Sequence, residues 1–177
     1  MLTDLPNRRL LLDRLAAAMA SSAERGRQGA LLLIDLDNFK ILDDTQGHNR
    51  GDLLLKDVAR RVQACVRTTD TVARLGGDVF VVLIEDLYGD SGEAHQQAAA
   101  MGEKLRLALS LTFDLEGYQY AGTPSIGVTL FAGVELCTDE CRPPWPHGWR
   151  WKAICARPSS NSNSCCTTRS RWPPTAA

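Results

Sequence analysis

The chain has little of several features that would narrow its role. Only 6% of its 177 residues are aromatic, and its formal net charge at pH 7 is −1. A charge so close to zero gives no reason to expect a nucleic acid or an anionic membrane surface as a partner. No apolar run is long enough to span a bilayer, and the N-terminus lacks a signal-peptide pattern. We therefore expect a cytoplasmic protein with no nucleic-acid partner and no membrane partner.

Cysteine is almost absent from the first 135 residues, where Cys65 is the only one, and it is frequent in the rest of the chain. All four tryptophans also lie after residue 135. That part of the sequence shows neither the apolar period of a strand nor that of a helix. We expect one folded domain over residues 1–135 and a disordered Cys-, Trp- and Pro-rich tail over residues 136–177.

Apolar periodicity predicts alternating helices and strands in the first part. Leucines recur at helical spacing after Asn7, a residue type that commonly caps helices, and this helix is expected to end near Gly26. The apolar run over 29–35 predicts a strand that is buried on both faces. Gly127 is expected to mark a close approach of two backbones. Further elements are expected as a short helix over 39–44, a helix capped by Asp52, a hairpin over 73–84, a helix over 93–111, and strands over 118–120 and 124–131. This order favours an α+β fold with a mostly antiparallel sheet and helices packed on it.

Asp35 and Asp78 are candidate metal ligands because one ends a buried strand and the other follows a glycine turn. Gly76-Gly77 precedes Asp78 at a tight turn, and glycines leave open space there. Asp35 ends the buried strand, and an antiparallel sheet can bring it beside Asp78. Two converging carboxylates suit Mg²⁺ or Mn²⁺, and the helix start after Leu36 offers backbone N–H groups to phosphates. The alternatives are a solvated Asp78 and an Asp37 that merely caps the short helix.

Four segments together resemble the GGDEF domain, the diguanylate cyclase family. They are Leu2–Arg9, Leu33–Lys40, Gly47–Asp52 and Val72–Phe80, in the family's order and with suitable spacing. The resemblance implies a fold like the palm of nucleotidyl cyclases, with a ferredoxin-like, mostly antiparallel sheet flanked by helices. It also implies that two GTP molecules condense into cyclic di-GMP, and that each is held by one of two facing domains in a homodimer.

The resemblance assigns roles to individual residues. Asp35 and Asp78 would hold the metal together with the Leu36 carbonyl, and Asp78 would also be catalytic. Arg67 and Asp70 match the R-x-x-D site at which cyclic di-GMP binds and inhibits, although such a pair taken alone is usually a surface ion pair. The substrate-binding positions are Asp37, Asn38, Phe39 and Lys40 around the phosphates, Asp43 and Asp52 at the guanine base, and His48, Gly76 and Gly77.

The sequence departs from the family at three places. The signature reads Gly76-Gly77-Asp78-Val79-Phe80, with valine where the family has glutamate. Asp43 stands where asparagine is usual, and an ionised carboxylate accepts hydrogen bonds but donates none. The family's last helix and strand have no counterpart after residue 135. We therefore expect cyclase activity that is weakened or lost. The alternatives are an inactive receptor for GTP or for cyclic di-GMP, and a non-functional remnant.

The tail suggests a shift of reading frame near residue 135. Codons can be chosen for Ser159–Arg171 that encode V-E-L-E-L-L-L-H-Y-Q-V-Q-V one frame over. That string resembles the opening strand of the EAL domain, a cyclic di-GMP phosphodiesterase that often follows GGDEF domains. We interpret the chain as the shifted or truncated GGDEF part of a GGDEF–EAL protein. A zinc module is the alternative, although the tail's cysteines lack paired ligand spacing, and disulfides are not expected in the cytoplasm.

Overall fold

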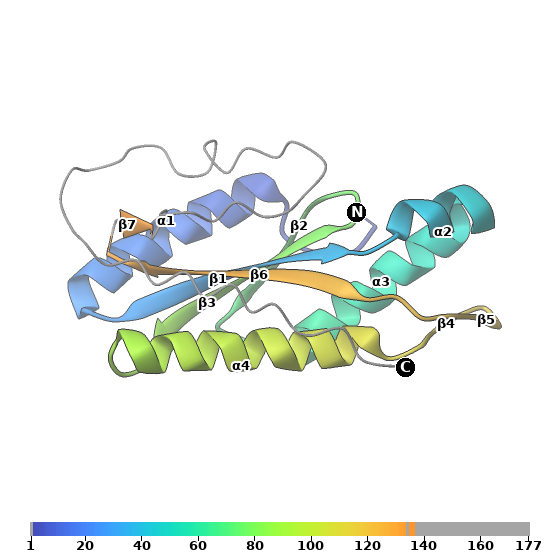
Figure 1. Ribbon diagram of the computed structural model, residues 1–177. Coiled ribbons are helices and arrows are strands. Elements are labelled where there is room, and N and C mark those ends of the chain that lie inside the picture. The colour runs from blue at the N-terminus through green and yellow to red at the C-terminus, as the bar shows by residue number, and fades with distance from the viewer. Residues whose placement is uncertain (1, 134, 137–177) are drawn as a thin grey trace.

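The computed structural model describes residues 2–133 and 135–136. Helices and strands alternate along this part of the chain (Figure 1). The helices are α1 (Arg8–Arg25), α2 (Phe39–Gln46), α3 (His48–Cys65) and α4 (Ser91–Ser110). The strands are β1 (Gln28–Leu36), β2 (Thr71–Gly76), β3 (Val79–Leu87), β4 (Phe113–Leu115), β5 (Tyr118–Tyr120), β6 (Pro124–Ala132) and β7 (Glu135–Leu136).

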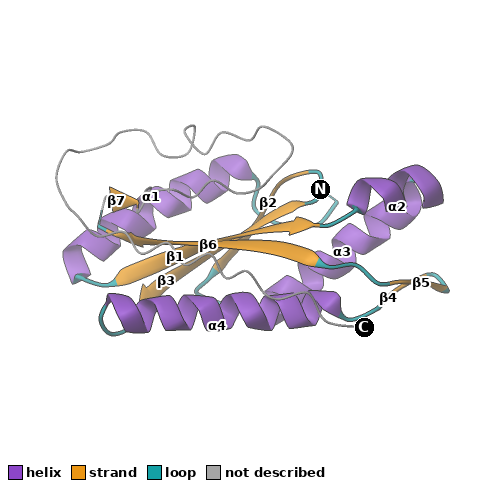
Figure 2. Ribbon diagram, in the orientation of Figure 1, coloured by secondary structure: helices purple, strands orange, loops and turns teal. Residues whose placement is uncertain are grey.

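A five-stranded sheet in the order β2-β3-β1-β6-β7 forms the middle layer (Figure 2). β1 is its central strand and pairs antiparallel with β3 on one side and with β6 on the other. Helix α1 lies on one face of the sheet, and α3 and α4 lie on the opposite face (Figure 1). The predicted α+β architecture with a mostly antiparallel sheet is therefore confirmed.

The side chains of β1 alternate between two apolar layers. Leu31 packs with Leu11 of α1 on one face. The opposite face of β1 packs against α3 and α4 and is completely buried, at Ala30, Leu32 and Ile34. Burial on both faces explains the continuous apolar run in the sequence. Because side chains alternate along a strand, Asp35 belongs to the same face as Leu31, the α1 face.

The ends of the helices follow local signals only in part. The side chain of Asn7 caps α1 by accepting a 3.0 Å hydrogen bond from a backbone N–H of the first turn, and Gly26 ends the helix at φ 63°. Both features agree with the prediction. The prediction that Asp52 caps the next helix is wrong, because α3 begins at His48 and Asp52 lies inside it. Gly47, at φ 85°, makes the turn between α2 and α3 alone, so no polar loop is needed.

The prediction for Gly127 of β6 is also wrong. A Cβ atom placed on this glycine would meet no atom within 4 Å. Gly127 is exposed and pairs with Leu33. Helix α1 packs farther along the sheet, where Leu31 and Phe131 lie. Apart from its neighbours within the sheet, no backbone approaches Gly127, because this corner of the α1 face is open within the described part of the chain.

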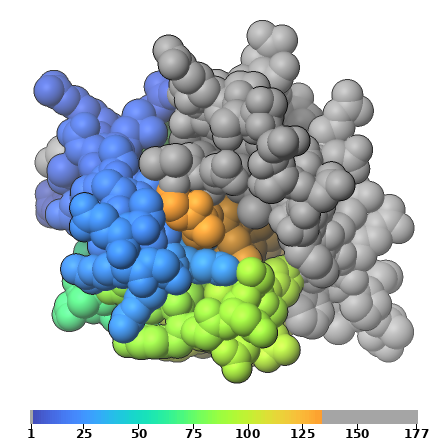
Figure 3. Space-filling model, turned by 90° about the vertical axis from the view of Figure 1, so that its left-hand side faces the viewer, coloured from blue at the N-terminus to red at the C-terminus, as the bar shows by residue number. Residues whose placement is uncertain are grey.

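Figure 3 views the end of the molecule at which α1 ends and α4 begins. Segments from the start of the chain, from β6 and from α4 meet at that surface although they lie far apart in the sequence. None of the described helices is both long and apolar enough to cross a membrane. The predicted tail over 136–177, with its cysteines and its EAL-like segment, lies outside the described residues except for Leu136, which belongs to β7.

Candidate functional site

Three strands place side chains in a row at one end of the sheet. Asp35, near the end of β1, pairs with Val79 of β3 on one side and with Ser125 of β6 on the other. Residues paired in this way point to the same face, and their Cβ atoms are about 4.5–5.5 Å apart. A longer acidic side chain at position 79 would therefore reach the surroundings of the Asp35 carboxylate, whereas valine does not.

The turn between β2 and β3 lies at the same end of the sheet. Gly76 at φ 145° and Gly77 at φ 54° adopt backbone conformations that favour glycine. A Cβ atom on either residue would meet no atom within 4 Å, so the space above the turn is open, as predicted. Asp78 directly precedes Val79, the cross-strand partner of Asp35. The fold thus brings Asp35 and Asp78 to the same edge.

Arg74 belongs to this site, although the sequence analysis did not single it out. Its Nε and one terminal nitrogen both donate to the carbonyl of Gly77, at 2.9 and 2.6 Å. Burial lowers the pKa of Arg74, and the nearby charges of Asp52 and Asp78 oppose this effect. Arg74 therefore fixes the turn, and its positive charge is felt by both carboxylates. An arginine two residues before a glycine pair was the signal available in the sequence.

The residues at this edge have oxygen donors of the kind that suits a divalent cation. Asp37 N donates to the carbonyl of Thr123 at 2.9 Å. Since backbone groups alternate sides along a strand, the Leu36 carbonyl points the other way, toward the start of β3 and Asp78. Two carboxylates and a carbonyl suit Mg²⁺ or Mn²⁺, which commonly complete their coordination with phosphates and water. No cluster of three or more acidic, His or Cys side chains could hold a metal alone within the described residues.

The turn from β1 into α2 is held by hydroxyl groups from the β6 side. Asp37 accepts hydrogen bonds from Thr123 Oγ1 at 2.7 Å and from Ser125 Oγ at 2.8 Å. The alternative that Asp37 caps α2 is therefore wrong. Asn38 takes the N-cap position at φ 61°, and its side chain makes no capping bond. The first backbone N–H groups of α2 thus have no side-chain cap. Asn38 and Lys40 are exposed there, and Phe39 is half-buried.

The junction of α2 and α3 gathers the residues assigned to the guanine base. His48 Nδ1 and Asp43 Oδ2 form a hydrogen bond of 2.8 Å. Gly51 makes room for this pair, because a Cβ atom there would clash with the other Asp43 oxygen. Asp52 follows on α3 and is exposed. Both Asp43 oxygens therefore have close neighbours before any ligand arrives.

Arg67 and Asp70 form a compact turn after α3. Arg67 N donates to Asp70 Oδ2 at 3.0 Å, and Asp70 N donates to the Arg67 carbonyl at 3.1 Å. Asp70 is 9% exposed, and among the described residues its Oδ1 has no hydrogen-bond partner. The exposed Arg67 guanidinium forms no ion pair within the described part of the chain. The alternative of a surface ion pair between Arg67 and Asp70 is therefore wrong. Lys104 Nζ donates to the Cys65 carbonyl at 2.7 Å and adds a cation beside the turn.

Comparison with known proteins identifies the family of the chain. The family model described as "Diguanylate cyclase, GGDEF domain" matches residues 1–136. The chain belongs to the GGDEF domain family. It is 44% identical to the bifunctional diguanylate cyclase/cyclic di-GMP phosphodiesterase MucR of Pseudomonas aeruginosa over 132 residues. This stretch covers 75% of this chain and 18% of MucR. The chain is 38% identical over 144 residues to diguanylate cyclase TpbB of the same species, 81% of this chain and 31% of TpbB. The chain therefore spans less than a third of either relative.

Solved structures agree with this assignment. The GGDEF domain of TpbB from Pseudomonas aeruginosa has a TM-score of 0.69 at 34% identity, covering 73% of both chains. A sensory box/GGDEF family protein from Caulobacter crescentus has a TM-score of 0.68 at 40% identity, covering 73% of this chain and 81% of that one. The GGDEF domain of DgcB from the same organism, solved in complex with cyclic di-GMP, has a TM-score of 0.65 at 28% identity, covering 77% and 78%. The predicted family and fold are confirmed.

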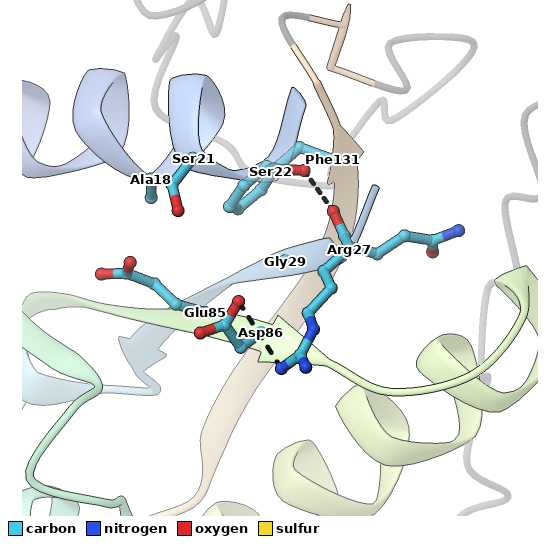
Figure 4. A pocket seen from close by; sticks show the side chains of 9 residues that line it. Ala18, Ser21, Ser22, Arg27, Gly29, Glu85, Asp86 and Phe131 are labelled. Carbon is cyan, nitrogen blue, oxygen red and sulfur yellow. Dashed lines mark hydrogen bonds and ion pairs between the residues drawn. The ribbon is translucent and has the colours of Figure 1, made fainter. Parts of the chain in front are cut away.

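Two hollows in this GGDEF domain lie away from the residues above. One, of about 280 Å³, separates α3 from the β4–β5 hairpin and is lined by side chains of both charges. The other lies under the end of α1 and measures about 10 Å³, room for at most one water (Figure 4). There Ser22 Oγ donates to the Arg27 carbonyl, and the Arg27 guanidinium is 4.0 Å from Asp86. These contacts tie α1 to β1 and β3, so we assign them a structural role.

Proposed function

We propose that this GGDEF domain binds GTP with a divalent cation at the end of the sheet, and that its condensation of two GTP molecules into cyclic di-GMP is weakened or lost. Val79 is the observation that carries the proposal. It faces the same side as Asp35, on the adjacent strand, where the family signature has glutamate. Valine has no oxygen to offer a metal, so Asp35 and Asp78 would act without a third carboxylate.

The start of α2 supports the GTP-binding half of the proposal. Its first N–H groups lack a side-chain cap, and the positive end of a helix dipole favours phosphate. Lys40 is exposed beside them. Asp43 and Asp52 can accept hydrogen bonds from the N–H groups of a guanine base. A triphosphate here would complete the coordination that two carboxylates leave open.

Restoring the signature glutamate tests the catalytic half. With GTP and Mg²⁺, we expect Val79→Glu to form cyclic di-GMP about a hundredfold or more faster than the wild type, since one charged group in such a site commonly has an effect of that size. Chromatography of the product measures this. Val79→Gln is the matched control, because it has the length of glutamate without the charge, and it should stay slow. Equal turnover by the wild type and Val79→Glu would contradict the proposal.

The same variant gives a second readout that does not depend on turnover. Without metal, a glutamate opposite Asp35 places like charges across a strand pair, which destabilises a sheet. Mg²⁺ should therefore raise the melting temperature of Val79→Glu more than that of the wild type. An identical Mg²⁺ response in both proteins would show that position 79 lies outside the metal's reach.

A receptor for cyclic di-GMP is a second candidate, favoured by the turn of Arg67 and Asp70. An exposed guanidinium can bind phosphate or stack on guanine, and the buried Asp70 oxygen has no partner in the described part. Calorimetric titration with cyclic di-GMP alone tests this candidate. If cyclic di-GMP produces no heat of binding, the receptor candidate is overturned. If GTP does not bind either, the remaining interpretation is that the domain is a non-functional remnant. The homodimer stays a prediction, to be tested by sedimentation.

A further inference from the structure

Asp37 lies in the turn assigned to the GTP phosphates, but its carboxylate is already engaged. Its two oxygens accept hydrogen bonds from Thr123 Oγ1 at 2.7 Å and from Ser125 Oγ at 2.8 Å. Its backbone N–H donates to the Thr123 carbonyl at 2.9 Å, and Tyr120 Oη donates to its carbonyl at 3.4 Å. All four contacts come from residues 120–125, which end β5 and begin β6.

We infer that Asp37 is a positioning residue that, with Thr123 and Ser125, braces the first turn of α2 and does not itself bind the phosphates. This inference rests on the GTP binding proposed above. A carboxylate facing the phosphates would repel them, whereas one held by two hydroxyl donors is directed toward β6. The brace thus presents backbone N–H groups to the ligand and keeps a negative charge away from it.

The conformation of Asn38 shows why a brace is needed. Its φ of 61° is uncommon for a residue other than glycine and persists where the surroundings fix it. The Asn38 side chain does not cap α2, so no local capping hydrogen bond holds this turn. The Asp37 contacts immediately before Asn38 supply the support from Thr123 and Ser125, around the start of β6 and 86 and 88 residues farther along the chain.

A mutant cycle separates bracing from direct binding. The variants are Asp37→Ala, the pair Thr123→Val and Ser125→Ala, and the combination of all three. The probe is Mg²⁺ with a GTP analogue that carries a methylene group between its α and β phosphates, titrated by calorimetry. We expect about tenfold weaker binding for Asp37→Ala and for the hydroxyl pair alike, and no further loss in the combination. Ser125→Thr keeps a hydroxyl at this position, so this variant should bind the analogue as tightly as the wild type does.

Other outcomes of the cycle would overturn the inference. If Asp37 contacted the phosphates or the metal, Asp37→Ala alone would weaken binding and the hydroxyl pair would leave it unchanged. Unchanged binding in every variant would remove any role for the brace, while the proposed GTP binding would stand. Thr45→Val is the matched control, because its hydroxyl bonds to the Ile41 carbonyl within α2 and not to Asp37.

Hydrogen exchange without nucleotide tests the brace independently of GTP. We expect the amides of Ile41 and Leu42, which both donate to the Asn38 carbonyl, to exchange about tenfold faster in Asp37→Ala and in the hydroxyl pair than in the wild type or Thr45→Val. Unchanged exchange at these amides would overturn the brace whether or not GTP binds. Failure of the wild type to bind the analogue, with exchange changed as expected, would overturn the proposed function and leave the brace in place.

Discussion

At the scale of single residues, the position of each charge decides what the end of the sheet can do. Val79 places an apolar side chain beside Asp35, where the family signature has a carboxylate. The carboxylate of Asp37 is directed toward the start of β6. Arg74 adds a cation that is bound to the hairpin turn. The loss at position 79 was visible in the sequence. The direction of the Asp37 carboxylate was not, because its partners lie more than 80 residues away.

Glu85 makes stability depend on pH. Burial raises its pKa above the ordinary value of 4.5, helped by the charges of Asp86 and Asp70 and opposed by two arginines. The folded protein therefore holds this proton more tightly than the unfolded chain, and stability falls as pH rises from about 4.5 through the folded-state pKa. We expect Glu85→Gln to melt at a higher temperature than the wild type near pH 7 and not near pH 4.

Thermal unfolding at both pH values measures the Glu85 effect. Glu24→Gln is the control, because Glu24 is an exposed glutamate on α1, and its substitution should shift the melting temperature little at either pH. A Glu85→Gln protein that is no more stable than the wild type near pH 7 would contradict the expected sign.

Arg61 closes the C-terminal end of α4 from its place on α3. Its guanidinium donates at 2.7–3.1 Å to three backbone carbonyls, those of Ala108, Leu111 and Thr112. The guanidinium also lies 3.7 Å from the centre of the Phe113 ring. We expect Arg61→Ala to lower the free energy of unfolding by about 2–3 kcal/mol, since three carbonyls lose a charged donor.

Urea unfolding tests the role of Arg61. Arg60→Ala is the matched control, because the Arg60 side chain is 79% exposed and pairs only with Asp57 among the described residues. Its substitution should change the free energy by no more than about 0.5 kcal/mol. Arg61→Lys should recover little of the loss, because an ammonium cannot reproduce the planar fork. Equal effects of Arg61→Ala and Arg60→Ala would contradict the assignment.

At the scale of elements, periodicity and turn chemistry predicted most helices and strands. α1, β1, α4 and the β2–β3 hairpin lie close to where the sequence placed them. β4 was missed: its three residues follow directly after α4, and the strand exists through its pairing with β5, which the sequence did predict. The start of α3 was misplaced, because one glycine replaced the polar loop that was expected.

Two glycines with equally open surroundings should respond oppositely to substitution. Neither Gly77 nor Gly127 has an atom within 4 Å of its Cβ position, but Gly77 has a φ of 54°. We expect Gly77→Ala to destabilise the fold by about 1–2 kcal/mol through backbone strain. Gly127→Ala should be stabilising by about 0.4–1 kcal/mol, because it restricts the unfolded chain. Chemical denaturation of both variants measures this, and a loss in Gly127→Ala would show that another backbone does approach it.

At the scale of the whole molecule, ligand binding should appear as stability. A ligand at a hundredfold excess over its dissociation constant stabilises the folded state by about 2.7 kcal/mol. If the domain is a receptor, cyclic di-GMP should raise the melting temperature of the wild type and not that of Arg67→Ala. Arg60→Ala, another exposed arginine of the same region, should respond like the wild type. An equal shift in Arg67→Ala would place the dinucleotide elsewhere.

The sequence alone determined the family, the sheet class and the residues that could carry chemistry, including the valine at position 79. Motifs, apolar periods and turn glycines are local, so they can be read within a few residues. Tertiary structure decided which of those residues meet. The pairing of Asp35 with Val79 depends on strand register, and the bonds of Asp37 to Thr123 and Ser125 span 86 and 88 residues. Such contacts follow from the packing of the whole sheet, which no local pattern encodes.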